Sequence, residues 1–102
     1  MFKNNRYITR GVRYQVPIEQ QLMMWAIIDD FLQKDTEVDY LQVMKLSPMV
    51  DEAGIKKQLI KHHQEVPTYV QSYLVSVDNI ISENIFIIDD GTNTTMMLAS
   101  EY

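Results

Sequence analysis

The sequence has 102 residues, of which 46% are hydrophobic and 23% are charged, and its formal net charge is −5. This size and composition predict one globular domain over residues 1–102. The chain has no cysteine, which excludes disulfides and thiolate metal sites, and it has no apolar run of signal-peptide or membrane-span length. We therefore expect a cytoplasmic protein.

Basic and acidic residues are separated along the chain. Residues 1–16 carry basic residues without an acid, whereas residues 69–102 carry acids without a base. An acidic protein repels nucleic acid at long range, so direct nucleic-acid binding is disfavoured. If it occurred, it would use the basic residues of two segments, namely Arg6, Arg10, Arg13, Lys56, Lys57 and Lys61.

The first half of the chain predicts a strand and then a long helix. Residues 7–16 alternate between apolar and polar types, as in a half-buried strand. Pro17 can begin a helix over about 17–34, because the first helical position tolerates a missing N–H. On this helix Met23 and Ile27 project from the polar side, which makes them a candidate contact patch. The alternative is that they are isolated exposed apolar residues.

The rest of the chain is predicted to be mostly strands. Residues 38–46 and 69–77 are rich in β-branched and apolar residues. Ser47-Pro48 resembles a helix cap, and Gly54 would end a short helix. Residues 55–65 fit a strand or a helix, and the strand is favoured because an internal glycine weakens the helix. Two further strands at 84–89 and 94–101 complete the prediction.

These elements predict an α+β fold. The sheet would be mostly antiparallel, with five or six strands, and the long helix would pack on one face.

The stretch Asp89-Asp90-Gly91-Thr92 invites comparison with the phosphatase motif D-x-D-G-T. In that motif the first aspartate is the nucleophile, and it lies two residues before the second aspartate, which corresponds to Asp90. Here that position is Ile88, so the nucleophile is missing. Asp-Gly between two strands is a strong hairpin signal, because both residue types accept positive φ. We interpret the stretch as a turn.

No catalytic, cofactor-binding or metal-binding residue can be assigned. His62 and His63 are adjacent, so they diverge in a strand or a helix and do not form a bidentate metal site. An enzyme is disfavoured, and we expect no cofactor. The alternative is a small-molecule- or metal-dependent enzyme with a site near His62, His63, Asp89 and Asp90.

Contact residues are easier to nominate. Tyr69 and Tyr73 would share one face of a strand, and tyrosine and methionine are enriched in interface cores. The seven methionines suit adaptable surfaces but are also ordinary core residues. A group of acids around the end of the helix could present carboxylates to a basic groove, and its members are Asp29, Asp30, Asp35, Glu37 and Asp39. The alternative is a solvated helix end and loop.

Several segments together resemble the bacterial family named domain of unknown function 960. They are "RYITRGV", "PIEQQLMMW", "DYLQV", "HHQEVPTYVQSY" and "IFIIDDGTNTTMMLASEY", and they span almost the whole chain. The resemblance implies a cytoplasmic, single-domain protein of Gram-positive bacteria and their mobile elements. It implies no activity, cofactor or catalytic residue.

The leading hypothesis is a non-catalytic protein-binding module. Its partner is a protein, with a homodimer as one form, and its sharpest version is a small acidic inhibitor of a nucleic-acid-handling enzyme, of the anti-restriction or anti-CRISPR type. The identity of the partner does not follow from the sequence.

Overall fold

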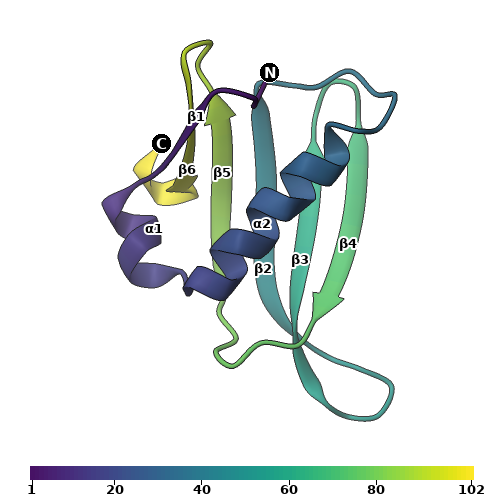
Figure 1. The fold of residues 1–102 in the computed structure, drawn as a ribbon. Helices are drawn as coiled ribbons and strands as arrows, with labels where there is room; N and C mark the ends of the chain where they lie inside the picture. Colours follow the sequence, from purple (N-terminus) through teal and green to yellow (C-terminus); the bar gives the residue numbers. More distant parts are fainter.

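The computed structural model describes residues 1–102 and contains one six-stranded sheet with α2 laid across one face (Figure 1). The strands lie in the order β1-β6-β5-β2-β3-β4. Every neighbouring pair is antiparallel except β1 and β6, which are parallel. The predicted α+β fold is therefore confirmed. The elements are β1 (Asn5–Ile8), α1 (Arg10–Gln15), α2 (Ile18–Phe31), β2 (Leu41–Val50), β3 (Lys56–Gln64), β4 (Tyr69–Val75), β5 (Glu83–Asp89), β6 (Asn93–Leu98) and the 3-10 turn η1 (Ala99–Glu101).

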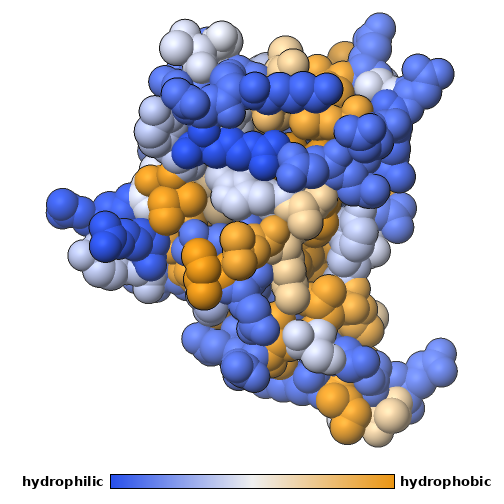
Figure 2. All heavy atoms as spheres, viewed as in Figure 1, coloured by the Kyte–Doolittle hydropathy of each residue, from blue (hydrophilic) through white to orange (hydrophobic).

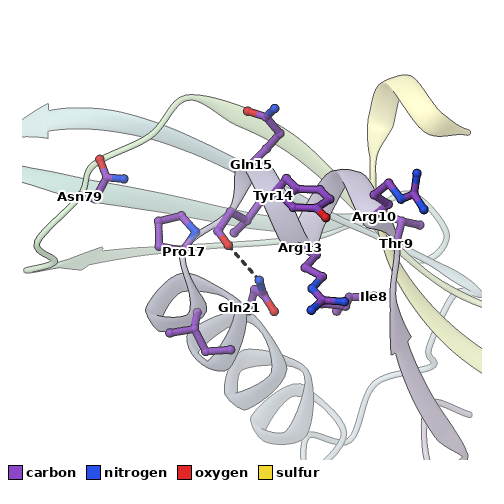
Figure 3. A pocket seen from close by; sticks show the side chains of 11 residues that line it. Ile8, Thr9, Arg10, Arg13, Tyr14, Gln15, Pro17, Gln21 and Asn79 are labelled. Carbon is purple, nitrogen blue, oxygen red and sulfur yellow. Dashed lines mark hydrogen bonds between the residues drawn. The ribbon is translucent and has the colours of Figure 1, made fainter.

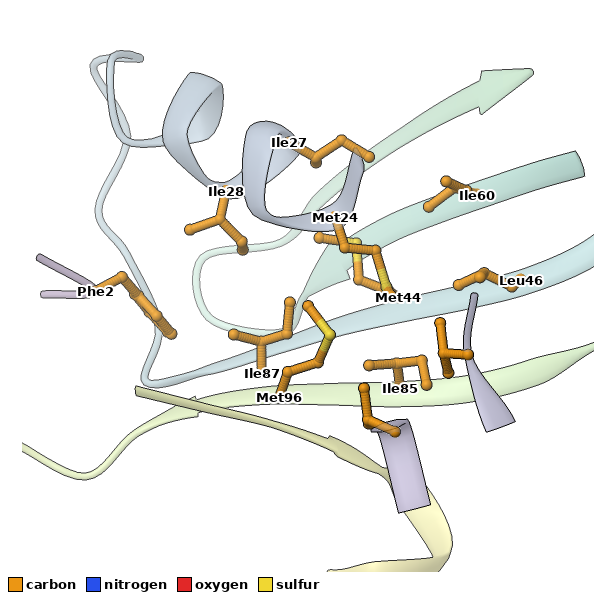
Figure 4. Close-up of a cluster of buried hydrophobic side chains, with 12 residues drawn as sticks. Phe2, Met24, Ile27, Ile28, Met44, Leu46, Ile60, Ile85, Ile87 and Met96 are labelled. Atoms are coloured by element: carbon orange, nitrogen blue, oxygen red, sulfur yellow. The ribbon is translucent and has the colours of Figure 1, made fainter. Parts of the chain in front are cut away.

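The hydrophobic core lies between α2 and the face of the sheet beneath it (Figure 4). Met24 and Ile28 of the helix are fully buried there, and each such side chain contributes about 1.5–3 kcal/mol to the free energy of unfolding. Strands β2, β3, β5 and β6 contribute every second residue to the same core, which is the period of a strand. These strand residues are Met44, Leu46, Ile60, Ile85, Ile87 and Met96.

The covered face also buries glutamines. Gln58 accepts a hydrogen bond from the Ile81 amide at 2.9 Å and donates to the Ser47 carbonyl at 3.0 Å. Gln64 accepts from the Asp39 amide at 2.8 Å. These amides tie the loops at both ends of the sheet to the strands, because buried backbone groups need partners.

The strand predicted over residues 7–16 is wrong. The structure ends β1 at Ile8 and begins α1 at Arg10. Thr9 caps this helix by accepting a hydrogen bond from the Val12 amide, which satisfies a free N–H of its first turn. Val12 and Val16, four residues apart, both face the core. The alternating residues after Thr9 thus also fit a helix, because the Thr9 cap allows a helix to begin there.

The short helix predicted at Ser47-Pro48 is also wrong. Strand β2 continues to Val50, and the Asp51 carboxylate closes a turn to β3 by accepting from the Ile55 amide at 2.9 Å. Strand β5 pairs with β2 only as far as Leu46. Pro48 lies beyond that point, where one side of β2 has no neighbour, and its missing N–H costs nothing there.

Residues 55–65 form the favoured strand, β3, and the predicted strands near 69–77, 84–89 and 94–101 are β4, β5 and β6 with shifted ends. The last of these ends at Leu98, after which η1 begins. No helix in the structure combines the length and apolar character of a membrane span.

Candidate functional site: the open face of the sheet

The face of the sheet opposite α2 has no helix over it (Figure 1). Because strand residues alternate between faces, the residues between the buried positions point to this side. Many of them are apolar although no α-helix covers them. We call this surface the open face, and its apolar residues are Tyr7, Leu41, Val43, Met49, Leu59, Val70, Leu74, Phe86, Ile88 and Met97.

The strands place these residues in rows. Val43 lies between His63 of β3 and Phe86 of β5, and Phe86 is in turn opposite Met97 of β6. Neighbours in such a row have Cβ atoms about 5 Å apart, so their side chains form a continuous surface.

The charges of the open face have one sign. Its strand positions carry Lys45, Lys57 and Lys61 but no carboxylate, in a chain whose formal net charge is −5. Lys57 is paired with Asp51 at 3.0 Å. Lys45 and Lys61 lie directly opposite each other on adjacent strands and form no ion pair. Like charges in this position destabilise a sheet, so folding alone does not explain them.

Aromatic residues lie at the other end of the open face. Tyr102 packs edge-on against Phe86, with ring centroids 5.5 Å apart and an interplanar angle of 78°. Side-chain hydrogen bonding to Tyr102 raises the pKa of the nearby Tyr40. Tyr40 and Tyr7 are each about half exposed, at 49% and 51%. Exposed tyrosines beside an apolar centre are typical of protein interfaces.

The predicted patch of Met23 and Ile27 is wrong as an exposed surface. Ile27 is only 7% exposed and belongs to the core, and Met23 packs against that core. The helix is rotated from the predicted orientation because Gln20 and Gln21 are buried. Gln20 donates to the Asn79 carbonyl at 2.6 Å and Gln21 to the Val16 carbonyl at 2.8 Å.

This rotation exposes two apolar residues in the first half of α2. Ile18 and Leu22 are 66% and 62% exposed. The space-filling view of the helix side shows hydrophobic atoms over the first half of α2 (Figure 2).

The structure separates the five predicted acids into bonded and free ones. Asp29 pairs with Arg6 at 2.5 Å, and Asp30 with Lys34 at 3.7 Å. The Asp39 carboxylate accepts from the Val66 amide at 3.3 Å. The other two, Asp35 and Glu37, are exposed, and their carboxylates have no ion pair.

The two predicted tyrosines share one face of β4, as expected, but it is the face beneath α2. Tyr69 packs on Phe31, with centroids 4.6 Å apart, and Tyr73 packs against the core. Burial raises the pKa of Tyr73. Both are half-buried, so their main contacts are internal.

The four residues of the alternative enzyme site do not meet. His62 lies under α2, while His63 is on the open face. His62 shares a row with Met44 and Ile85, so Asp89 is two strands away and four residues, roughly 13 Å, further along. No three His, Asp or Glu residues lie close enough to share a metal ion.

His62 has a structural environment. Its Nε2 atom is 2.6 Å from Gln42 Oε1, and Phe31 packs edge-on against its ring with centroids 5.0 Å apart. Gln42 gives its own N–H groups to Gln64 and to the Asp39 carbonyl, so His62 Nε2 is the donor. Burial, with a smaller effect of the His63 charge, lowers the pKa of His62 to about 4.

Asp89 and Asp90 belong to the predicted turn. The Asp90 carboxylate accepts from the Asn93 amide at 2.8 Å. Asp89 accepts from the Gly91 amide at 2.7 Å and from the Phe2 amide at 2.5 Å, which holds the N-terminal segment on the sheet. Backbone hydrogen bonds, first of all those from Phe2 and Asn93, lower the pKa of both carboxyls. The turn interpretation is confirmed.

The open face was not predicted from the sequence, although a signal for it exists. In the strands predicted after residue 38, apolar residues occupy both sets of alternate positions, as at Leu41 and Val43 against Met44 and Leu46. A strand that is apolar on both faces predicts a second contact surface or a second layer.

The fold and this surface define a class: a small α+β protein with one helix-covered sheet face and one open face of apolar residues and lysines. The chain matches the family described as staphylococcal protein of unknown function (DUF960) over residues 5–101, and it belongs to that family.

A crystal structure of a protein of unknown function from Enterococcus faecalis has the same fold. Its TM-score is 0.79 at 24% sequence identity, and the match covers 97% of this chain and 91% of that one. The comparison with curated proteins gives no match.

Proposed function

We propose that this protein is a non-catalytic binding module whose open face receives an apolar, acidic surface of another protein. The observation that supports this most is the charge of that face, where Lys45 and Lys61 stand side by side without a carboxylate in an acidic chain. Apolar residues surround them. A partner with carboxylates around an apolar centre would complement this surface, because opposite charges set specificity and orientation.

A second copy of this chain is a poorer partner for this face. A twofold dimer brings the same surface together from both chains. Lys45 and Lys61 of both copies would then gather, and neither has a carboxylate partner. A nucleic acid is also a poorer partner, because the lysines are few, Lys57 is already paired with Asp51, and the central side chains are mostly aliphatic.

The test uses two charge reversals on the same strand. Lys61→Glu changes the open face, and Lys56→Glu changes an exposed lysine on the other face of β3. Both variants alter the net charge equally. Tagged wild type and variants would be used to capture proteins from a host lysate, and the captured protein would then be purified for binding isotherms.

We expect a stoichiometric complex whose affinity falls at least tenfold in Lys61→Glu and stays within twofold in Lys56→Glu. The affinity should also fall steeply with salt. Equal effects of the two substitutions would contradict the proposal. So would capture of nucleic acid, or a dimer in light scattering that Lys61→Glu dissociates.

The narrower role as an acidic inhibitor of a nucleic-acid-handling enzyme stays a prediction. It depends on carboxylates that are free to meet a basic groove, and Asp35 and Glu37 are the two without internal bonds. If a captured partner were such an enzyme, replacing both residues with the corresponding amides should weaken the complex at least tenfold. An unchanged affinity would exclude this version and leave the open-face proposal in place.

A further inference from the structure

A groove of about 810 Å³ lies between α1 and the first turn of α2, on the opposite side of the sheet from the open face (Figure 3). Figure 3 shows Arg13 reaching down toward Gln21 and Ile8, with Tyr14 above it. Arg10 lies at one end, beside Thr9. A concave site of this volume is in the range of small-molecule pockets.

The groove is cationic. Arg10 and Arg13 both line it, and no aspartate or glutamate does. Neither arginine forms an ion pair with a carboxylate of the chain. Arg6 shows the opposite behaviour, because it pairs with Asp29 at 2.5 Å and lies 4.9 Å over the Trp25 ring. The two groove arginines are therefore free to bind an anion.

The first turn of α2 adds to the same field. Pro17, its N-cap residue, and Ile18 both line the groove, and no side chain caps this end of the helix. The positive end of a helix dipole stabilises a nearby negative charge. Here the helix dipole adds to the positive potential of Arg10 and Arg13 and does not form a site alone.

The groove also has an apolar side. Ile18 is 66% exposed and Tyr14 is 74% exposed. The space-filling view shows hydrophilic atoms over α1 next to hydrophobic atoms over the start of α2 (Figure 2). A ligand can thus place a charged group on the arginines and an apolar or ring portion against the neighbouring residues.

We propose that this groove binds a small organic phosphate monoester. At neutral pH a monoester carries close to two negative charges, which matches two guanidinium groups, and arginine forms paired hydrogen bonds with phosphate oxygens. This inference is independent of the binding module proposed above, because the two surfaces lie on opposite faces of the sheet.

Phenyl phosphate is the first probe, because it joins a dianion to a ring. A titration followed by amide shifts in ¹H–¹⁵N spectra should saturate, with the largest changes in residues 8–21. Inorganic phosphate should bind the same residues at least fivefold more weakly, because it lacks the ring. Equal affinities for the two probes would overturn the organic part of the proposal.

A thymidine oligonucleotide without terminal phosphates separates a monoester from a nucleic-acid backbone. It contains only diesters with one charge each, and it should bind at least tenfold more weakly per site than phenyl phosphate. Tighter binding of the oligonucleotide would overturn the proposal in favour of a nucleic-acid site.

Charge-neutral variants complete the test. Arg13→Gln and Arg10→Gln change exposed side chains, so the fold should survive, and melting curves would check this. Each should weaken phenyl phosphate binding at least tenfold, while Lys56→Gln, which removes the same charge elsewhere, should change it less than twofold. Equal losses of phenyl phosphate affinity in all three variants would show a general charge effect and overturn the proposal of a site in this groove.

Discussion

The two faces of the sheet differ in a way that reverses the usual arrangement. The face under α2 buries polar side chains, including Gln42, Gln58 and His62 at 0% exposure, whereas the open face presents aliphatic and aromatic side chains such as Val43 and Phe86. The amides of Gln42 and Gln58 form hydrogen bonds with backbone groups and with other buried side chains, so they serve the fold. No α-helix lies over the apolar residues of the open face, although Tyr102 packs on Phe86 there. Folding therefore leaves much of this face available to a partner.

The first prediction, with a large expected effect, tests whether the buried amides hold the covered face together. Gln58→Leu removes the partner of the Ile81 amide and of the Ser47 carbonyl. Leaving the Ile81 amide unsatisfied and removing the other bonds of the Gln58 amide should lower the free energy of unfolding by about 3 kcal/mol. Urea unfolding would measure the change.

The matched control is Gln71→Leu, an exposed glutamine of β4 on the same side of the sheet. It should change the free energy of unfolding by less than about 0.5 kcal/mol. Similar losses in both variants would show that the amide network contributes nothing specific.

The second prediction concerns the pH dependence of the free energy of unfolding, and it compares His62 on the covered face with His63 on the open face. His62 has a pKa of about 4 in the folded protein and an ordinary value of 6.5 when unfolded. Between these values the unfolded chain binds the extra proton. The free energy of unfolding should therefore fall by about 1.4 kcal/mol for each pH unit below 6.5, and this contribution should level off near pH 4.

The comparison is made with two variants. His62→Gln should lose this slope between pH 6.5 and 4, while His63→Gln on the open face should keep it. An NMR titration of the wild type should show the His62 ring titrating near pH 4. A slope that persists in His62→Gln would assign it to other groups.

The third prediction compares the two aspartates of the β5–β6 turn. In Asp89→Asn, an amide NH₂ would face the N–H groups of Phe2, Asn4 or Gly91, which all donate to the carboxylate. The loss of one such bond should cost about 1–2 kcal/mol of unfolding free energy. Differential scanning calorimetry would measure it.

Asp90→Asn is the control, because a single oxygen of Asp90 accepts from both Thr92 and Asn93 and an asparagine keeps that oxygen. It should change the melting temperature little. The pKa of Asp89 is lowered in the folded state, so its contribution is present above about pH 4 and is lost as the pH falls through the folded pKa. The Asp89→Asn variant should lack that acid-side loss, and an unchanged acid profile would contradict this assignment.

The sequence predicted the sheet, the helix and the turn because each depends on local signals. Strand propensity, Pro17 and Asp90-Gly91 act within a few residues. The predicted orientation of α2 was wrong because Gln20 and Gln21 count as polar residues in any periodicity. In the structure their amides are buried and reach backbone carbonyls far away in the sequence or across a turn. The open face and the arginine groove depend on strand order and helix packing, which single-strand patterns do not contain.

The smallest predicted effect is also the one that most directly links the open face to function. Lys61 lies directly opposite Lys45, and Lys61→Glu would replace a like-charge pair with an opposite one. The isolated protein should become more stable by about 0.5 kcal/mol, measured by urea unfolding in low salt, and the gain should shrink in high salt. Lys56→Glu, on the other side of the same strand, should give no such gain.

The fold alone does not require a residue whose replacement stabilises the protein but weakens a complex. A binding surface predicts this opposition between stability and binding. If Lys61→Glu instead destabilised the protein, the lysine pair would have a structural role, and the main support for a partner on the open face would be lost.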